Sequence, residues 1–174
     1  MGIIPSKQET ADFETVYEKY YDRVYKYAYT LLLNREDAED VTSETFLAAY
    51  THFAGYDPAK ASVVTWLTRI AHNKAVNLVR APARSKRSEM PEEWDPADEG
   101  PDFTEQIGTS DAVVQLYARL TPEEREFLNL RYVMELKDRE IAALMGLPEK
   151  TVNKRYQRLL ARCRTMMGGE AALR

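Results

Sequence analysis

The segment from residue 81 to residue 110 constrains the fold of this chain more than any other feature. It holds four prolines, two glycines and eight carboxylates against three bases, with no helical spacing of apolar residues. Proline breaks helices, and so acidic a segment cannot bury enough apolar surface to offset the entropy of ordering it. We therefore expect a flexible acidic linker over 81–110 between two separate domains, 1–80 and 111–174.

The first part of the chain has the apolar spacing of helices and lacks the alternation of half-buried strands. Three helices are predicted, over about 13–31, 36–52 and 62–80. Asn34-Arg35 is expected to break the first helix, and Ala81-Pro82 to end the third. The first helix has an i, i+3, i+4, i+7 stripe formed by Phe13, Val16, Tyr17, Tyr20, Val24, Tyr27, Ala28 and Leu31.

The second part predicts four shorter helices. Thr121-Pro122-Glu123-Glu124 has the pattern of a capping box with proline at the first helical position. Further along, a short helix, the turn Gly146-Leu147-Pro148 and a longer basic helix follow one another, which is the layout of a helix-turn-helix. The predicted fold class is therefore all-α, with two small helical domains and a helix-turn-helix in the second.

Composition excludes several classes of protein. Apolar runs are only a few residues long, and the N-terminus has no basic region followed by an apolar stretch, so neither a membrane span nor a secretory signal is predicted. One cysteine and two histidines give no disulfide and no Cys- or His-based metal site. No nucleophile–base pattern is present. We expect a cytoplasmic, non-enzymatic protein without a cofactor or metal.

The net charge of −4 hides a local cluster of positive charge. Residues 150–169 contain six bases and no acid. A phosphate backbone responds to local charge, so the acidic isoelectric point of about 5.4 does not argue against nucleic-acid binding.

The last predicted helix separates packing residues from basic residues. Val152, Tyr156, Leu159 and Cys163 fall on one face, and an adjacent face consists of Thr151, Arg155, Arg158 and Arg162 with Lys154 at its edge. Arginine can bind guanine edges or phosphates. The alternative is a solvated basic face on a core helix, which the helix dipole would also favour.

The predicted helix over 62–80 has a second polar face. Leu67, Ala71, Ala75 and Leu78 form its apolar stripe, and Arg69, Asn73, Asn77 and Arg80 lie opposite, with Trp66 at the rim. Arginine, amide and aromatic side chains together suit separated nucleic-acid strands, because they bind phosphates, base edges and base faces. The alternative is a half-buried tryptophan beside an ordinary polar surface.

Three motifs together resemble bacterial sigma factors. The stretch Asp37-Ala38-Glu39-Asp40-Val41-Thr42-Ser43-Glu44-Thr45-Phe46-Leu47 is similar to their polymerase-binding helix. Trp66-Leu67-Thr68-Arg69-Ile70-Ala71-His72-Asn73 is similar to their promoter-melting helix. Glu140-Ile141-Ala142, Gly146 and Thr151-Val152-Asn153-Lys154-Arg155 are similar to their C-terminal helix-turn-helix. The order and the length fit the compact extracytoplasmic-function (ECF) group.

The resemblance implies a function and a set of partners. The first domain would dock on the β′ clamp helices of core RNA polymerase and open the minus-ten promoter element. The second would bind the minus-thirty-five element as duplex, next to the β flap, and an anti-sigma factor is an expected further partner. The implied polymerase-binding residues are Asp37, Asp40, Glu44 and Leu47; those at minus ten are Trp66, Arg69, Asn73, Asn77 and Arg80; those at minus thirty-five are Lys150, Thr151, Lys154, Arg155 and Arg158.

Several positions depart from the family pattern. Ser43 stands where glutamine is frequent, Asn77 where aspartate is frequent, and Asn153-Lys154 where Lys-Ser is frequent. Lys137 stands where a capping serine often opens the helix-turn-helix, so that Asp138 is a candidate cap instead.

Two questions stay open on the sequence alone. A stand-alone helix-turn-helix regulator, acting without polymerase, is the alternative function. In the family the segment between the domains runs toward the cationic active cleft of polymerase. The acidic linker is therefore either a mimic of RNA in that channel or only a tether.

Overall fold

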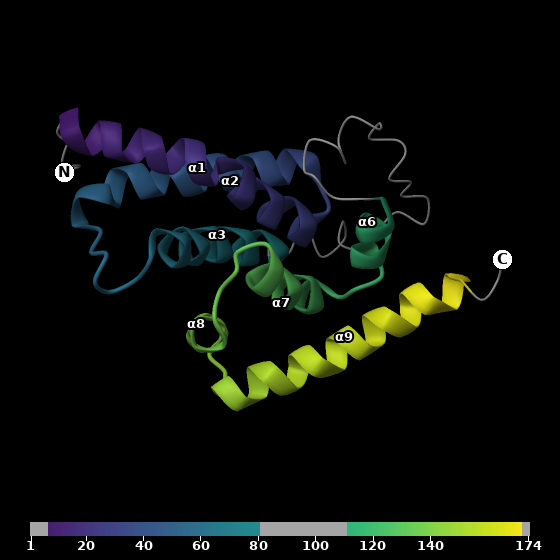
Figure 1. The fold of residues 1–174 in the computed structure, drawn as a ribbon. Helices are drawn as coiled ribbons and strands as arrows, with labels where there is room; N and C mark the ends of the chain where they lie inside the picture. Colours follow the sequence, from purple (N-terminus) through teal and green to yellow (C-terminus); the bar gives the residue numbers. More distant parts are fainter. Residues whose placement is uncertain (1–6, 81–110, 172–174) are drawn as a thin grey trace. The chain divides into compact units, whose positions relative to one another are not determined.

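The computed structural model describes residues 7–80 and 111–171, and every regular element within these ranges is helical. The chain divides into two compact units, Met1–Pro91 and Glu92–Arg174. The predicted all-α, two-domain fold is thus confirmed (Figure 1). The predicted linker 81–110, with all eight of its carboxylates, lies outside the described residues.

The first unit is a bundle of α1 (Lys7–Leu32), α2 (Arg35–His52) and α3 (Val63–Arg80), in which each helix contacts the other two (Figure 1). Each contributes an apolar stripe to a common core, which is how amphipathic helices are stabilised. The fully or nearly fully buried side chains include Val24, Tyr27, Tyr29, Val41, Phe46, Leu67, Ala71 and Ala75.

The junction between α1 and α2 differs in detail from the prediction. Leu33, with φ of 49°, takes the left-handed conformation that ends α1, and its amide donates to the Tyr29 carbonyl. Asn34 is the N-cap of α2, because its side-chain oxygen accepts from the Asp37 amide at 2.9 Å. The expected break at Asn34-Arg35 is therefore one residue earlier, and Arg35 already belongs to α2.

A tight loop leads into α3. After the 3₁₀ turn Phe53–Gly55, the Tyr56 hydroxyl donates to the Ala61 carbonyl at 2.8 Å and closes the loop. The Ser62 hydroxyl oxygen accepts from the Thr65 amide at 3.2 Å, so serine caps α3 where the sequence predicts its start. The cap and the closed loop together fix the residue at which α3, and with it its polar face, begins.

The second unit consists of α6 (Asp111–Ala118), α7 (Pro122–Tyr132), α8 (Asp138–Met145) and α9 (Glu149–Ala171). Helix α9 contacts each of the other three helices. The predicted capping box is confirmed: Thr121 and Glu124 exchange hydrogen bonds at 3.3 and 3.0 Å, with Pro122 as first helical residue. The core between these helices includes Val114, Leu130, Met134, Ile141, Val152 and Tyr156.

No helix in residues 7–80 or 111–171 is both long enough and apolar enough to cross a membrane.

Candidate nucleic-acid and partner interfaces

The turn between α8 and α9 has the geometry of a helix-turn-helix. Gly146 ends α8 with φ of 65°, a left-handed conformation that glycine adopts without strain, and the Leu147 amide donates back to Ala142 at 2.9 Å. At the other end of α8 the Lys137 amide donates to the Glu140 carboxylate at 2.8 Å. Asp138 does not cap this helix as suggested; its carboxylate is paired with Arg131 of α7.

The packing stripe of α9 is buried as predicted. Val152, Tyr156, Leu159 and Cys163 are all less than one-tenth exposed. The Tyr156 hydroxyl donates to the Phe127 carbonyl at 2.8 Å, and the Arg131 guanidinium lies 4.5 Å from the centre of its ring. Burial raises the pKa of the Tyr156 hydroxyl and that of the Cys163 thiol. These contacts fix the rotation of α9 on the domain.

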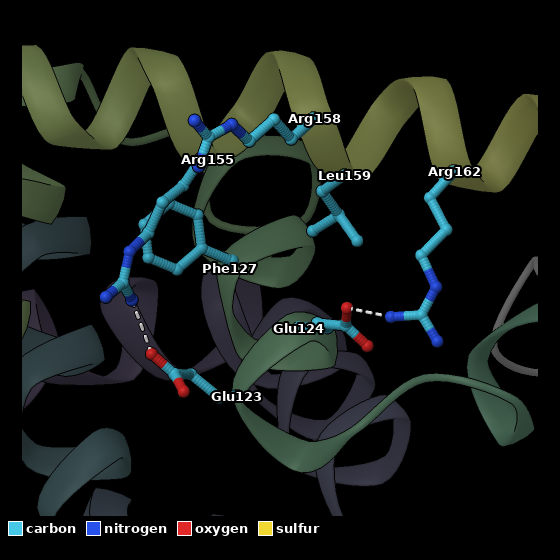
Figure 2. Close-up of a pocket in the computed structure, with 7 residues that line it drawn as sticks. All are labelled: Glu123, Glu124, Phe127, Arg155, Arg158, Leu159 and Arg162. Carbon is cyan, nitrogen blue, oxygen red and sulfur yellow. Dashed lines mark hydrogen bonds and ion pairs between the residues drawn. The ribbon is translucent and has the colours of Figure 1, made fainter.

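The flank of α9 next to α7 carries two paired arginines. Arg155 Nη1 lies 2.5 Å from Glu123 Oε1, and Arg162 pairs with Glu124 (Figure 2). Between the two pairs lies a pocket of about 270 Å³ whose apolar lining is Phe127 and Leu159. The Arg155 guanidinium is therefore directed toward α7 and not away from the domain.

The open face of α9, opposite the buried stripe, is formed by Lys150, Asn153, Lys154, Gln157, Ala161 and Arg164, all exposed. Arg158, also exposed, stands at the edge of this face and lines the pocket beside α7 (Figure 2). Lys150, Lys154 and Arg158 were predicted as DNA-binding residues, and Thr151 is half-buried at the edge. Asn153, Gln157 and Arg164 share this face and were not among the predicted residues. Centring the helical wheel opposite the apolar stripe, instead of on the arginines, would have included them.

The predicted polymerase-binding residues of α2 lie along one side of the helix, and three of the four are exposed. Asp40, Glu44 and Leu47 are exposed, Leu47 at 68%, and Asp37 is half-buried in the first turn. The Glu44 carboxylate lies 2.8 Å from the Lys74 ammonium group of α3. Leu47 therefore adds exposed apolar area next to the carboxylates of this strip.

The polar face of α3 is also exposed. Arg69, Asn73 and Asn77 point to solvent. Trp66 is half-buried against the preceding loop, with its ring 4.8 Å from that of Tyr56 and 6.3 Å from that of Phe53. The indole is therefore packed on aromatic neighbours at the rim of the face. The side chain of Arg80, at the end of α3, lies outside the described residues.

The described residues contain no group of three or more His, Cys, Asp or Glu side chains arranged to hold a metal ion.

Comparison with known proteins places both units in one family. The profile of Sigma-70 region 2 matches residues 16–85, and that of Sigma-70, region 4 matches residues 110–163. The chain belongs to the sigma-70 family. The resemblance inferred from the three sequence motifs is thereby confirmed, and each matched region lies within one of the two compact units of this sigma-70 family member.

Three similar curated proteins are ECF RNA polymerase sigma factors. SigE of Mycolicibacterium smegmatis is 35% identical over 142 residues, which are 79% of this chain and 54% of SigE. BldN of Streptomyces coelicolor is 31% identical, over 88% of this chain and 61% of BldN. SigW of Bacillus subtilis is 29% identical, over 84% of this chain and 83% of SigW. The chain thus spans a little over half the length of SigE and BldN, and most of SigW.

Solved structures share the fold of this sigma-70 family member. The sigma factor RpoE of Bartonella quintana, in complex with the anti-sigma factor NepR, has a TM-score of 0.70 at 19% identity, over 90% of this chain and 97% of RpoE. CnrH, in complex with the cytosolic domain of CnrY, has a TM-score of 0.64 at 22% identity, over 92% of this chain and 90% of CnrH.

Proposed function

We propose that this chain is an ECF-type sigma factor that directs core RNA polymerase to specific promoters and helps to open the minus-ten element. The observation that carries the proposal is the match of sigma-70 regions 2 and 4 to the two helical units in the family's order. The open basic face of α9 and the largely exposed strip of α2 support it, because each is a surface suited to one of the two partners.

The docking surface on polymerase is the strip Asp37, Asp40, Glu44 and Leu47. Its carboxylates suit basic groups on the β′ clamp helices, and Leu47 supplies apolar area. Exposed charges contribute little to folding. At an interface, however, removing one partner of a desolvated pair costs roughly 2–5 kcal/mol.

The promoter-opening surface is the face of α3 with Trp66, Arg69, Asn73, Asn77 and Arg80. Exposed amides and a guanidinium can bind the edges and phosphates of unpaired nucleotides. Because Trp66 is packed on Tyr56, it offers a base at most one edge or face, and Arg69 and Asn73 are the stronger candidates for direct contact.

The duplex-binding surface is α9, with Lys150, Thr151, Lys154, Arg155 and Arg158, to which we add the exposed Asn153, Gln157 and Arg164. Amides and arginines on one helix face can read base edges in the major groove. The same unit is the proposed contact of the β flap.

The remaining partners follow from this role. An anti-sigma factor is a proposed partner, because the structurally similar RpoE of Bartonella quintana was solved with one. A protein that acts on promoter DNA would work in the bacterial cytoplasm, and no catalytic activity of its own is proposed. A stand-alone helix-turn-helix regulator is not favoured, because such a regulator has no use for region 2.

Binding of the full chain to purified core polymerase tests the proposal. Asp40→Arg should weaken this binding at least about tenfold while leaving thermal unfolding nearly unchanged, since Asp40 is exposed on the docking strip. Glu39→Arg is the matched control: it reverses a charge one residue away on the other flank of α2, at an exposed side chain whose carboxylate pairs with the equally exposed Arg35. Equal affinity of parent and Asp40→Arg for core polymerase would contradict the docking assignment, and no binding by the parent would contradict the function.

A further inference from the structure

Two carboxylates at the start of α7 lie against the proposed DNA-binding helix. Glu123 pairs with Arg155 at 2.5 Å, and Glu124 pairs with Arg162 (Figure 2). The partners are 32 and 38 residues apart in the sequence, so the folded unit, and not local helix geometry, brings them together.

Helix capping fixes the position of Glu124. Its Oε2 accepts from the Thr121 amide at 3.0 Å, while Oε1 faces Arg162. Its side chain is 24% exposed, against 64% for Glu123. Because the capping box already orders this carboxylate, holding Arg162 costs little additional side-chain entropy.

The two pairs are poorly placed to stabilise the fold. The arginine side chains are 45% and 49% exposed, and ion pairs as exposed as these contribute little to stability. Buried packing by Val152, Tyr156 and Leu159 already holds α9 on the unit. Their exposure therefore favours a role for these two ion pairs other than stabilising the fold.

Pairing changes the charge that α9 offers to a duplex. Duplex affinity depends on the counterions released when cations neutralise phosphates. An arginine that must leave a carboxylate gives almost no net release, since the carboxylate then takes up a cation itself. Of the six bases between residues 150 and 164, Arg155 and Arg162 are in this state. Lys154 on the open face and Arg158 at the rim of the pocket, by contrast, have no carboxylate partner in the described part of the chain.

We propose that Glu123 and Glu124 are specificity-determining residues that compete with DNA phosphates for Arg155 and Arg162. They lower the affinity of α9 for any duplex while leaving the base-reading side chains of the open face available. Specific promoters are then favoured over other DNA by contacts to bases, and not by overall charge. This inference rests on the proposed function, because it assumes that α9 binds duplex DNA.

The test is the salt dependence of binding by the full chain to a duplex of scrambled promoter sequence. Glu123→Gln and Glu124→Gln each remove a competing charge, and glutamine at 124 can still accept the capping hydrogen bond. Each variant should bind more tightly than the parent at low salt, with a salt slope steeper by about 0.9. Between about 50 and 200 mM salt its affinity should fall about 3.5-fold further than that of the parent.

Two controls separate competition from a general change of charge. In an Arg155→Ala background, Glu123→Gln should no longer alter the slope, because no arginine is released. Glu149→Gln makes the same change of charge in the first turn of α9, at an exposed residue with no basic partner in the described part of the chain, and should leave the slope near that of the parent.

The failures of the two proposals are distinguishable. A parent chain that binds no duplex, alone or within holoenzyme, contradicts the proposed function and with it this inference. A parent that binds duplex, with Glu123→Gln and Glu124→Gln variants of unchanged slope, contradicts only the competition. Lowered unfolding temperatures with unchanged slopes would assign the two ion pairs to folding instead.

Discussion

Tyr156 joins the proposed DNA-binding helix to the rest of its domain. Its hydroxyl donates to the Phe127 carbonyl, and its side chain is 3% exposed. Burial, and then the nearby Tyr132, raise the pKa of this hydroxyl above its usual value of 10. The stabilisation that it provides is therefore fully present below about pH 10, and it is lost as the pH rises above that value.

Tyr156→Phe should lower the free energy of unfolding by about 0.5–1.5 kcal/mol at neutral pH, because one buried hydrogen bond is lost. Above about pH 10 the parent should lose stability more steeply than the variant, by up to about 1.4 kcal/mol per pH unit. Denaturant unfolding of the full chain at several pH values checks both effects. Tyr132→Phe, at a side chain 57% exposed, should leave the unfolding midpoint at pH 7 unchanged. Parallel pH profiles for parent and Tyr156→Phe would show that this hydroxyl does not couple folding to pH.

Arg158 is a candidate to read a base, since it is exposed at the edge of the open face and has no carboxylate partner among the described residues. Arg158→Ala should cost about 1–3 kcal/mol of holoenzyme affinity, concentrated at one position of the minus-thirty-five element. A panel of single-base promoter variants measures this. Uniform weakening across the panel, with a salt slope reduced by about 0.9, would assign Arg158 to phosphate instead.

Individual side-chain directions were harder to predict than helix faces. The wheel correctly placed Val152, Tyr156 and Leu159 inside the domain, because apolar burial fixes the rotation of a helix. It could not show that Arg155 turns toward Glu123, or that Asp138 pairs with Arg131, since both depend on carboxylates or cations from another helix. Long flexible side chains pair with charged groups that only the tertiary structure brings near them.

At the scale of elements, sequence signals located the helix ends well where a cap is local. Ser62 and Thr121 begin α3 and α7 as expected, because the hydroxyl and the amide that it caps are three residues apart. The end of α1 was misplaced by one residue because Leu33 adopts a left-handed conformation that is uncommon for its residue type. Nothing in the local sequence marks that position.

Helix α3 combines a buried stripe with a polar face, and that combination allows a test of promoter opening. Asn73→Ala and Arg69→Ala alter exposed side chains, so the packing of Leu67 and Ala71 should be preserved. Both variants should form holoenzyme normally and open promoter more slowly, as measured with a fluorescent base in the minus-ten element. Trp66→Ala is a poorer probe, because it also removes contacts with Tyr56 and Phe53. Normal opening rates in both variants would place the strand-separating surface elsewhere.

At the scale of the whole molecule, one chain carries two units, for which we propose separate partners. Tethering turns the second binding event into an intramolecular one, so weak contacts at each promoter element can add up to firm binding. The sequence indicated two domains correctly because a proline-rich acidic segment interrupts both helical patterns. The sequence left undecided whether that segment, which lies outside the described residues, does anything besides tethering the two units.

The charge of the segment gives the last prediction. From Glu89 to Glu105 there are eight carboxylates and no lysine or arginine. A polyanion suits a cationic channel built to hold RNA, and growing transcript would then have to displace it. Replacing all eight acids with serine and glutamine at constant length should leave holoenzyme formation intact, because the docking residues are untouched. The pattern of abortive transcripts and the pattern of promoter escape should both change. In holoenzyme, the protection of the segment from protease should no longer depend on salt concentration. If initiation kinetics and protease sensitivity both match the parent, the 30 residues from 81 to 110 serve only as a tether.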